Sequence, residues 1–105
     1  MERVELLGLP LDPVGMEEAL ARIQGFLEEE GTHQVVTLNP EIAVRAQEDQ
    51  ALRQAILEAE LVTPDGVGIL WAAKRLLGRE LKERVTGVDL TLALFRRFPG
   101  IRVYL

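Results

Sequence analysis

The feature that most constrains the fold is a strand-like segment that passes directly into a helix start, and it occurs twice. Segment 33–38 is β-rich and ends at Asn39-Pro40, where asparagine suits an N-cap and proline suits the first helical position. Segment 61–63 is also apolar and β-rich, and it passes through a Pro-Asp-Gly turn into an apolar helical pattern. Strands that alternate with helices indicate an α/β fold with a largely parallel sheet flanked by helices.

The remaining elements follow from apolar periodicity and from helix-capping residues. The pattern predicts helices over 14–29, from 40 to about 59 with a break near Glu48-Asp49, over 66–77 and over 87–98, and further strands over 3–7 and 101–105. Two prolines within 9–13 predict a turn or a sheet edge. Helix 66–77 is apolar almost all round, so we expect it to be buried and Trp71 to lie in the core.

The last helix carries a start signal and an apolar face of its own. Thr86 fits an N-cap and Asp89, three residues later, fits a capping box. Apolar side chains share one face of helix 87–98, namely Val88, Leu92, Phe95 and Phe98. The predicted strand 101–105 has no following helix to cover it, a pattern that fits a truncated α/β domain and a complete domain ending in a strand equally well.

Length and composition place the chain among ordinary single domains. It has 105 residues, 48% hydrophobic and 28% charged, with no cysteine. The most apolar run, 66–73, is followed at once by Lys74 and Arg75 and is too short to cross a bilayer. The first residues lack the pattern of a secretory signal, and the absence of cysteine is compatible with a reducing compartment. The cytoplasm is therefore the expected location.

The charge is unevenly distributed along the chain. Residues 1–60 hold thirteen acidic and four basic residues, a net charge of −9, whereas 61–105 hold four acidic and eight basic residues, a net charge of +4. The bases crowd into Lys74, Arg75, Arg79, Lys82 and Arg84, which could meet phosphates, although a solvated face is the simpler interpretation. No aromatic residue interleaves this stretch, so nucleic-acid binding is not predicted.

Three loops hold polar residues where a ligand would bind in an α/β sheet, at the carboxyl ends of the strands. The candidates are Thr37 and Asn39 in the first loop, Asp65 with Gly66 and Gly68 in the second, and Arg84, Thr86 and Asp89 in the third. Each also has a structural explanation, as a helix cap, a turn residue or half of a capping box. On the residues alone, the structural explanation is favoured.

Known cofactor and metal motifs are not matched. Gly66 and Gly68 are spaced as in a dinucleotide fingerprint, but Trp71 replaces the third glycine and no acidic residue follows near position 86. The chain lacks a Walker lysine motif, paired cysteines and a histidine cluster, and the lone His33 before a strand favours a structural role. We therefore predict no metal and no cofactor.

Three segments together closely resemble the WecG/TagA/CpsF family, bacterial glycosyltransferases of the N-acetylmannosaminyltransferase type. They are 36–41 (VTLNPE), 61–69 (LVTPDGVGI) and 83–90 (ERVTGVDL), in the family's order and spacing. The resemblance implies a Rossmann-like fold and an inverting transfer from a UDP-sugar, typically UDP-N-acetylmannosamine, to a polyprenyl-diphosphate-linked sugar. It also implies a metal-independent reaction at the inner face of the cell membrane, in teichoic acid, enterobacterial antigen or exopolysaccharide synthesis.

The resemblance also assigns roles to residues. Asp65 looks like the family's catalytic base, which would take the proton of the acceptor hydroxyl. Thr37 and Asn39 would line the pocket and orient sugar hydroxyls, while Arg84 and the amides near Gly66 and Gly68 would stabilise the departing diphosphate.

Family members continue past residue 105 into a nucleotide-binding half and a basic carboxyl-terminal segment that contacts the membrane. By this resemblance, residues 1–105 form the amino-terminal α/β part of a glycosyltransferase whose second half is absent, and the piece alone is expected to be inactive. Apolar groups left uncovered on 87–98 and 101–105 predict a homo-oligomer.

Two alternatives remain open. The chain could be a non-enzymatic α/β module that binds a nucleotide or oligomerises, with the same loops used only for capping. It could also be a phosphate-ester hydrolase with Asp65 as nucleophile, which should require a divalent metal.

Overall fold

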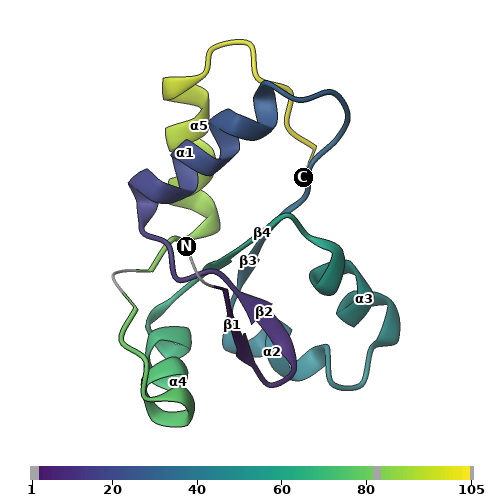
Figure 1. The fold of residues 1–105 in the computed structure, drawn as a ribbon, viewed down its shortest axis with the longest axis vertical. Coiled ribbons are helices and arrows are strands. Elements are labelled where there is room, and N and C mark those ends of the chain that lie inside the picture. The colour runs from purple at the N-terminus through teal and green to yellow at the C-terminus, as the bar shows by residue number, and fades with distance from the viewer. Residues whose placement is uncertain (1–2, 82–83, 105) are drawn as a thin grey trace.

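In the computed structural model, which describes residues 3–81 and 84–104, the elements alternate as an α/β fold requires (Figure 1). In chain order they are β1 (Val4–Leu6), β2 (Leu9–Leu11), α1 (Met16–Leu27), β3 (Val35–Leu38), α2 (Pro40–Arg45), α3 (Gln50–Glu58), β4 (Leu61–Pro64), α4 (Val67–Leu77) and α5 (Gly87–Arg97). The predicted α/β class is confirmed. The sheets are smaller than expected, each with two strands within the described residues.

The central pair, β3 and β4, is parallel, as predicted. Val35 lies opposite Leu61 and Leu38 opposite Pro64, and α2 and α3 form the connection between the two strands. All four residues of β4 are buried. Val62 belongs to a cluster with the β1–β2 hairpin and α3, whereas Leu61 belongs to a second cluster with α1 and α5. Strand β4 is therefore covered on both faces, which explains its continuous apolar sequence.

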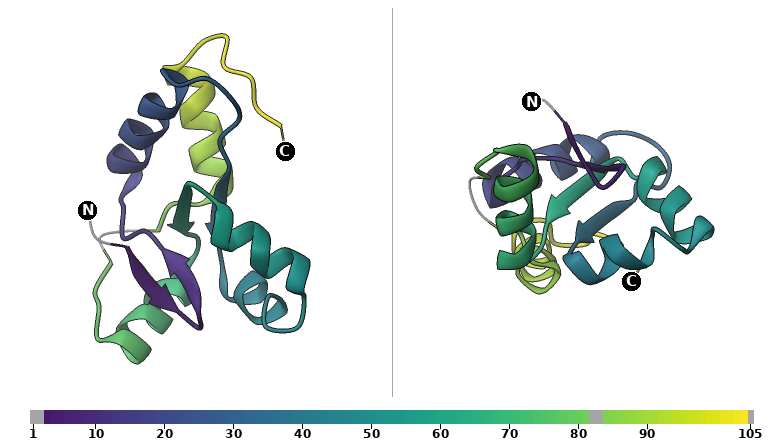
Figure 2. Two further views of the ribbon diagram at one scale, coloured as in Figure 1. Left: turned by 45° about the vertical axis from the view of Figure 1, so that its right-hand side comes forward. Right: turned by 90° about the horizontal axis from the view of Figure 1, so that it is seen from below.

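Helices α1 and α5 lie side by side at one end of the molecule, and α4 lies at the other (Figures 1 and 2). The predicted helices 14–29, 66–77 and 87–98 are confirmed as α1, α4 and α5, with ends within two residues of the expected ones. The break near Glu48-Asp49 is confirmed too, because the Asp49 carboxylate caps α3 through the amide of Leu52 at 3.0 Å.

The prediction of a turn or edge at 9–13 is wrong in part, because residues 9–11 form a strand. Strands β1 and β2 pair antiparallel around Leu7 and Gly8, whose φ angles are 53° and 76°. Pro10 lies opposite Glu5, one position beyond the pair nearest the turn. In a two-residue hairpin that position is not hydrogen-bonded, so the missing N–H of Pro10 removes nothing from the ladder.

An ion pair between the buried Asp12 carboxylate and the exposed Arg3 lies at the end of this hairpin and joins it to β4. Asp12 is 3% exposed, and its carboxylate accepts hydrogen bonds from Arg3 Nε at 2.8 Å and Nη2 at 3.0 Å. The same carboxylate accepts the Val62 amide at 2.8 Å, and the Asp12 amide donates to the Val62 carbonyl at 2.8 Å. The hydrogen bond to Asp12 raises the pKa of the Arg3 guanidinium, against an opposing effect of desolvation. The polar atoms of the buried Asp12 carboxylate are thereby satisfied.

Two further expectations about packing are wrong. Trp71 is 67% exposed rather than buried, because the core is met by the opposite side of α4, through Ile69 and Ala73. Residues 101–104 form no strand, because no strand of the described residues pairs with them; Leu105 lies outside those residues. On α5 the expectation of uncovered apolar groups is confirmed, because Val88, Leu92 and Phe95 are exposed while Leu90 and Leu94 are buried.

We expect acid to remove the contribution of the exposed pair between Glu17 and Arg97, which join α1 to α5 at 3.0 Å. The hydrogen bond to Arg97 lowers the pKa of Glu17 below its ordinary value of 4.5. Folding then gains stability above that ordinary value, and the gain is lost as the pH falls through the lowered pKa. Glu17→Gln should therefore lower the melting temperature slightly at neutral pH and not in strong acid. A difference that persists in acid would contradict this assignment.

Candidate functional site

The carboxyl ends of β3 and β4 meet at one edge, and the polar residues predicted from the first two loops gather there. Thr37 lies near the end of β3, and Asp65 follows β4 directly. The Asp65 amide donates to the Leu38 carbonyl at 2.9 Å, which extends the pairing of the two strands by one residue. Since parallel strands end at the same edge, both side chains are held by backbone hydrogen bonds rather than by a free loop.

The third loop joins this edge through β4. The Val85 amide donates to the Pro64 carbonyl, and the buried Thr63 hydroxyl donates to the Val85 carbonyl at 3.4 Å. These bonds bring the start of α5 over Asp65, where the Gly87 amide donates to Asp65 Oδ2 at 3.3 Å. The three predicted loops are therefore brought together around one carboxylate.

Gly87 is the closest point of contact between the loops. A Cβ at this position would lie 3.2 Å from Thr37 Oγ1 and 3.9 Å from Asp65 Oδ2. The Thr37 hydroxyl and the Asp65 carboxylate thus flank the same backbone atom. Asp65 is half-buried, and among the described residues its Oδ1 accepts no hydrogen bond. One carboxylate oxygen is therefore held by the Gly87 amide, and the other has no hydrogen bond from the described residues.

Asn39, Gly66 and Gly68 have the structural roles that the sequence allowed. Asn39 Oδ1 caps α2 by accepting the Ile42 amide at 2.8 Å, which leaves its side-chain nitrogen without a partner among the described residues. Gly66 has a φ of 92°, which disfavours any side chain. Gly68 lets α4 pack on α2, because a Cβ there would lie 2.8 Å from Pro40 Cγ. These contacts place the first turns of α2 and α4 beside Asp65.

Arg84 lies next to this edge, immediately before the hydrogen-bonded Val85. Its side chain is exposed and forms no ion pair within 3–81 and 84–104. Thr86 caps α5, since its hydroxyl accepts the Asp89 amide at 3.2 Å. Of the predicted basic cluster, Lys82 lies outside the described residues, and Lys74 forms an exposed pair with Glu80 at 3.2 Å.

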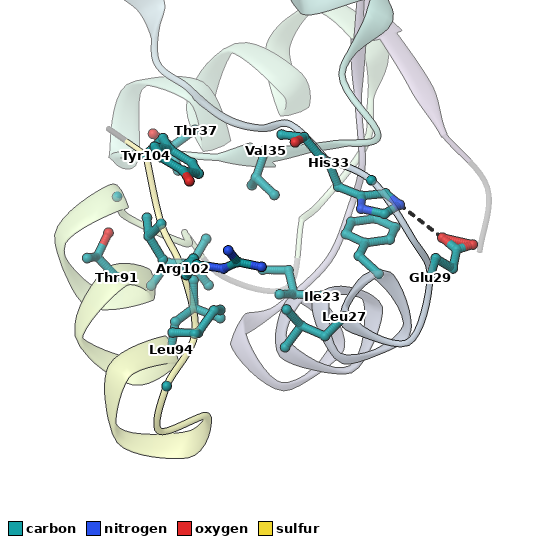
Figure 3. Close-up of a pocket in the computed structure, with 18 of the residues that line it drawn as sticks. Ile23, Leu27, Glu29, His33, Val35, Thr37, Thr91, Leu94, Arg102 and Tyr104 are labelled. Carbon is teal, nitrogen blue, oxygen red and sulfur yellow. Dashed lines mark hydrogen bonds and ion pairs between the residues drawn. The ribbon is translucent and has the colours of Figure 1, made fainter.

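A groove with a volume of about 1240 Å³ opens beside Thr37 and Gly87 (Figure 3). Its walls come from α1, β3, α5 and residues 100–104, and Tyr104 lies across it from His33 in the close-up. His33 stacks on Phe26 with ring centroids 4.9 Å apart and bonds Glu29 at 3.0 Å, so its role here is structural. Of the predicted site residues only Thr37 lines this groove, together with Gly87, so the groove borders the site and does not contain the Asp65 carboxylate.

A comparison with known protein families shows which family this chain belongs to. The model of the glycosyl transferase WecG/TagA/CpsF family matches residues 4–105. The chain belongs to this family. The resemblance read from the three sequence segments is thereby confirmed.

Curated relatives come from Staphylococcus aureus, among them proteins of strains NCTC 8325, COL and MRSA252. Each is named N-acetylglucosaminyldiphosphoundecaprenol N-acetyl-beta-D-mannosaminyltransferase and is 32% identical over 90 residues. The match covers 84% of this chain and 35% of each relative, so the chain spans about a third of the length of these family members.

In the part of this WecG/TagA/CpsF family member that the structure describes, no three histidine, aspartate or glutamate side chains lie close enough together to hold a metal ion. Nor does any helix of the described residues have the length and apolar character needed to cross a membrane. Sequence reasoning missed Gly87 as a site residue, although its place after Thr86, inside the third family segment, could have indicated it.

We expect Gly87→Ala to damage the site and leave the fold intact. The added methyl group would press on Thr37 Oγ1 and lie against Asp65 Oδ2, while alanine is a better helix former than glycine. In the full-length protein, turnover should fall roughly 10- to 100-fold, because a small displacement of catalytic groups slows the reaction by this order, with little change in melting temperature. Gly25→Ala on α1 is the matched control, because nothing lies within 4 Å of its added methyl. Normal turnover in Gly87→Ala would contradict this picture of the site.

Proposed function

We propose that the chain is part of an inverting glycosyltransferase that moves N-acetylmannosamine, or a related sugar, from a UDP-sugar to a polyprenyl-diphosphate-linked acceptor. The reaction would serve cell-surface polysaccharide or teichoic acid synthesis. The observation that carries the proposal is the Asp65 carboxylate, held by the Gly87 amide beside Thr37 at the edge where three family segments meet. The relatives' names describe a transfer of this kind.

In the proposed step, Asp65 acts as the general base. Its unpartnered Oδ1 takes the proton of the acceptor hydroxyl while that oxygen attacks the anomeric carbon of the donor sugar. The bond between the anomeric carbon and the diphosphate oxygen breaks, and its electron pair leaves with UDP. Attack from the face opposite the leaving group inverts the anomeric configuration.

The other site residues would bind the two substrates. The Arg84 guanidinium and the first amides of α4, near Gly66 and Gly68, are donors suited to the charge that develops on the leaving diphosphate. The Thr37 hydroxyl, beside Gly87, and the side-chain nitrogen of Asn39 would orient sugar hydroxyls. No metal or cofactor is required in this scheme.

We also propose that residues 1–105 are the amino-terminal part of a longer transferase at the inner face of the cell membrane. A second half would supply nucleotide contacts, a basic carboxyl-terminal segment would contact the membrane, and the chain would form homo-oligomers. The coverage of 35% of each relative supports a longer protein. Exposed Val88, Leu92 and Phe95 on α5 support a surface that another part or copy covers.

The decisive experiment is a transfer assay with the longest chain that the reading frame encodes, run beside the 105-residue chain. UDP-N-acetylmannosamine and a polyprenyl-diphosphate-linked N-acetylglucosamine are the substrates. We expect release of UDP and an inverted glycosidic bond with the longer chain, and neither with the 105 residues alone. A retained configuration, or binding of UDP without any transfer, would reject the proposal.

A non-enzymatic α/β module is the second candidate, favoured by the fact that Asn39 and Thr86 both cap helices. It predicts ligand binding or oligomerisation without turnover.

Removal of divalent metal is expected to leave turnover unchanged. Arg84 supplies a fixed positive charge where a metal-dependent enzyme would hold its ion, and Asp65 has no carboxylate partner in the described site. Turnover should therefore be the same with and without a chelator. Loss of turnover, restored by magnesium or manganese, would point instead to metal-dependent chemistry such as hydrolysis of a phosphate ester.

A further inference from the structure

The outer face of α4 carries apolar side chains that the fold leaves open. Val67 is 64% exposed and Trp71 is 67% exposed. They are four residues apart and so lie on the same side of the helix, one turn from each other. A tryptophan with most of its surface in water costs free energy unless another surface covers it.

Basic side chains continue this face toward the end of the helix. Lys74 and Arg75 follow Trp71 by three and four residues, so helical periodicity places them beside it. Segment 66–79 contains three basic residues and no acidic one. The pair of Lys74 with Glu80 is exposed at both ends and contributes little, and Arg75 has no ion pair among the described residues.

We propose that this α4 face, formed by Val67, Trp71, Lys74 and Arg75, rests on an anionic lipid bilayer. Tryptophan favours the boundary between lipid and water, where its ring is apolar and its N–H can reach a polar group. Lysine and arginine lay their stems on apolar surface and direct their charges to lipid phosphates. A second copy of the chain fits the face less well, because its own α4 face would bring the same positive charges against Lys74 and Arg75.

The position of α4 links this surface to the site, and this step rests on the proposed function. Helix α4 begins two residues after Asp65, and Val67 is its first residue. A bilayer under α4 would therefore lie within a few helical turns of the carboxylate that receives a lipid-linked acceptor. The acidic run 28–30 follows α1, at the end of the molecule opposite α4 (Figure 2), so its repulsion from anionic lipid is weakest in this orientation.

Trp71 gives a direct test, because it is the one tryptophan of the 105 residues. Its fluorescence is recorded with phosphatidylglycerol vesicles and with phosphatidylcholine vesicles, without donor or acceptor. We expect a blue shift and protection from acrylamide quenching with the anionic vesicles only. Both effects should be reversed by high salt, since the attraction to lipid phosphates is screened.

Variants separate the contribution of α4 from general adhesion. Lys74→Gln with Arg75→Gln should weaken binding to anionic vesicles by on the order of 30-fold in a flotation assay, since each charge contributes about fivefold. Arg96→Gln with Arg102→Gln is the matched control, because it removes two exposed bases from the part of the molecule that holds α5, at the other end from α4. This control should bind normally.

The proposal is overturned if the protein does not bind anionic vesicles, if it binds while Trp71 stays fully quenchable, or if the α5 control weakens binding as much as the α4 variant. A blue shift that grows with protein concentration without vesicles would assign the face to a second copy. Since no substrate is present, vesicle binding does not depend on turnover. Vesicle binding together with a longer chain that shows no transfer would reject only the proposed function.

Discussion

In the full-length protein, replacement of Asp65 by asparagine is expected to lower turnover by about 10² to 10⁴, the range for loss of a general base. The amide oxygen of asparagine can still accept the Gly87 amide, so the link between the end of β4 and the start of α5 should persist. Asparagine cannot take the proton of an acceptor hydroxyl at neutral pH. The loss should therefore fall on kcat, with little change in the Michaelis constant of either substrate or in melting temperature.

Asp89→Asn is the matched control for this experiment. Asp89 lies in the first turn of α5, is exposed, and contributes only its backbone amide to the Thr86 cap. The same change of charge two residues beyond Gly87 should leave turnover near normal. Near-normal turnover in Asp65→Asn would reject the role of base, whereas loss of folding in that variant would assign Asp65 to structure.

The second large effect is expected on stability, at Asp12. Asp12→Ala would leave the Val62 amide without its acceptor and the Arg3 guanidinium without its partner. Breaking a buried ion pair costs about 3 to 5 kcal/mol, and the value here should lie near or below the lower end because the Arg3 side chain is 37% exposed. A cost of about 2 to 3 kcal/mol would lower the melting temperature by roughly 10 °C or more.

Thermal unfolding of Asp12→Ala beside Glu17→Gln checks this expectation. Both variants remove the acid of an ion pair with arginine, one in the core and the other on the surface. The surface variant should change the melting temperature only slightly. Equal effects of the two variants would show that burial of Asp12 is not the cause.

Helix starts and element order could be predicted because their causes are local. The side chains of Asn39, Asp49 and Thr86 each accept a hydrogen bond from the backbone amide three residues ahead. Such an interaction depends on only four consecutive residues, so the sequence predicts it. The exposure of Trp71 could not be predicted in this way. Apolar residues around a helix show that it can be buried, and only the number of neighbouring elements decides how much of it is.

The candidate site also has one part that local sequence predicts and one part that only the tertiary structure shows. The positions of Thr37 and Asp65 at strand ends follow from the sequence pattern and the rule for parallel sheets. The contact between Asp65 and Gly87 spans 22 residues and depends on the amide of Val85 reaching the Pro64 carbonyl. No local pattern specifies that hydrogen bond, so Gly87 entered the site only with the structure.

The burial of β4 on both faces has a consequence for how this small chain unfolds. Each of the two hydrophobic clusters takes a residue from β4, Val62 in one and Leu61 in the other. Neither cluster can come apart without disturbing the strand that the other requires, so the two should melt in a single cooperative transition. The amides of β4 should then exchange with solvent only through global unfolding. The backbone that leads into Asp65 would therefore be the most rigid part of this small domain.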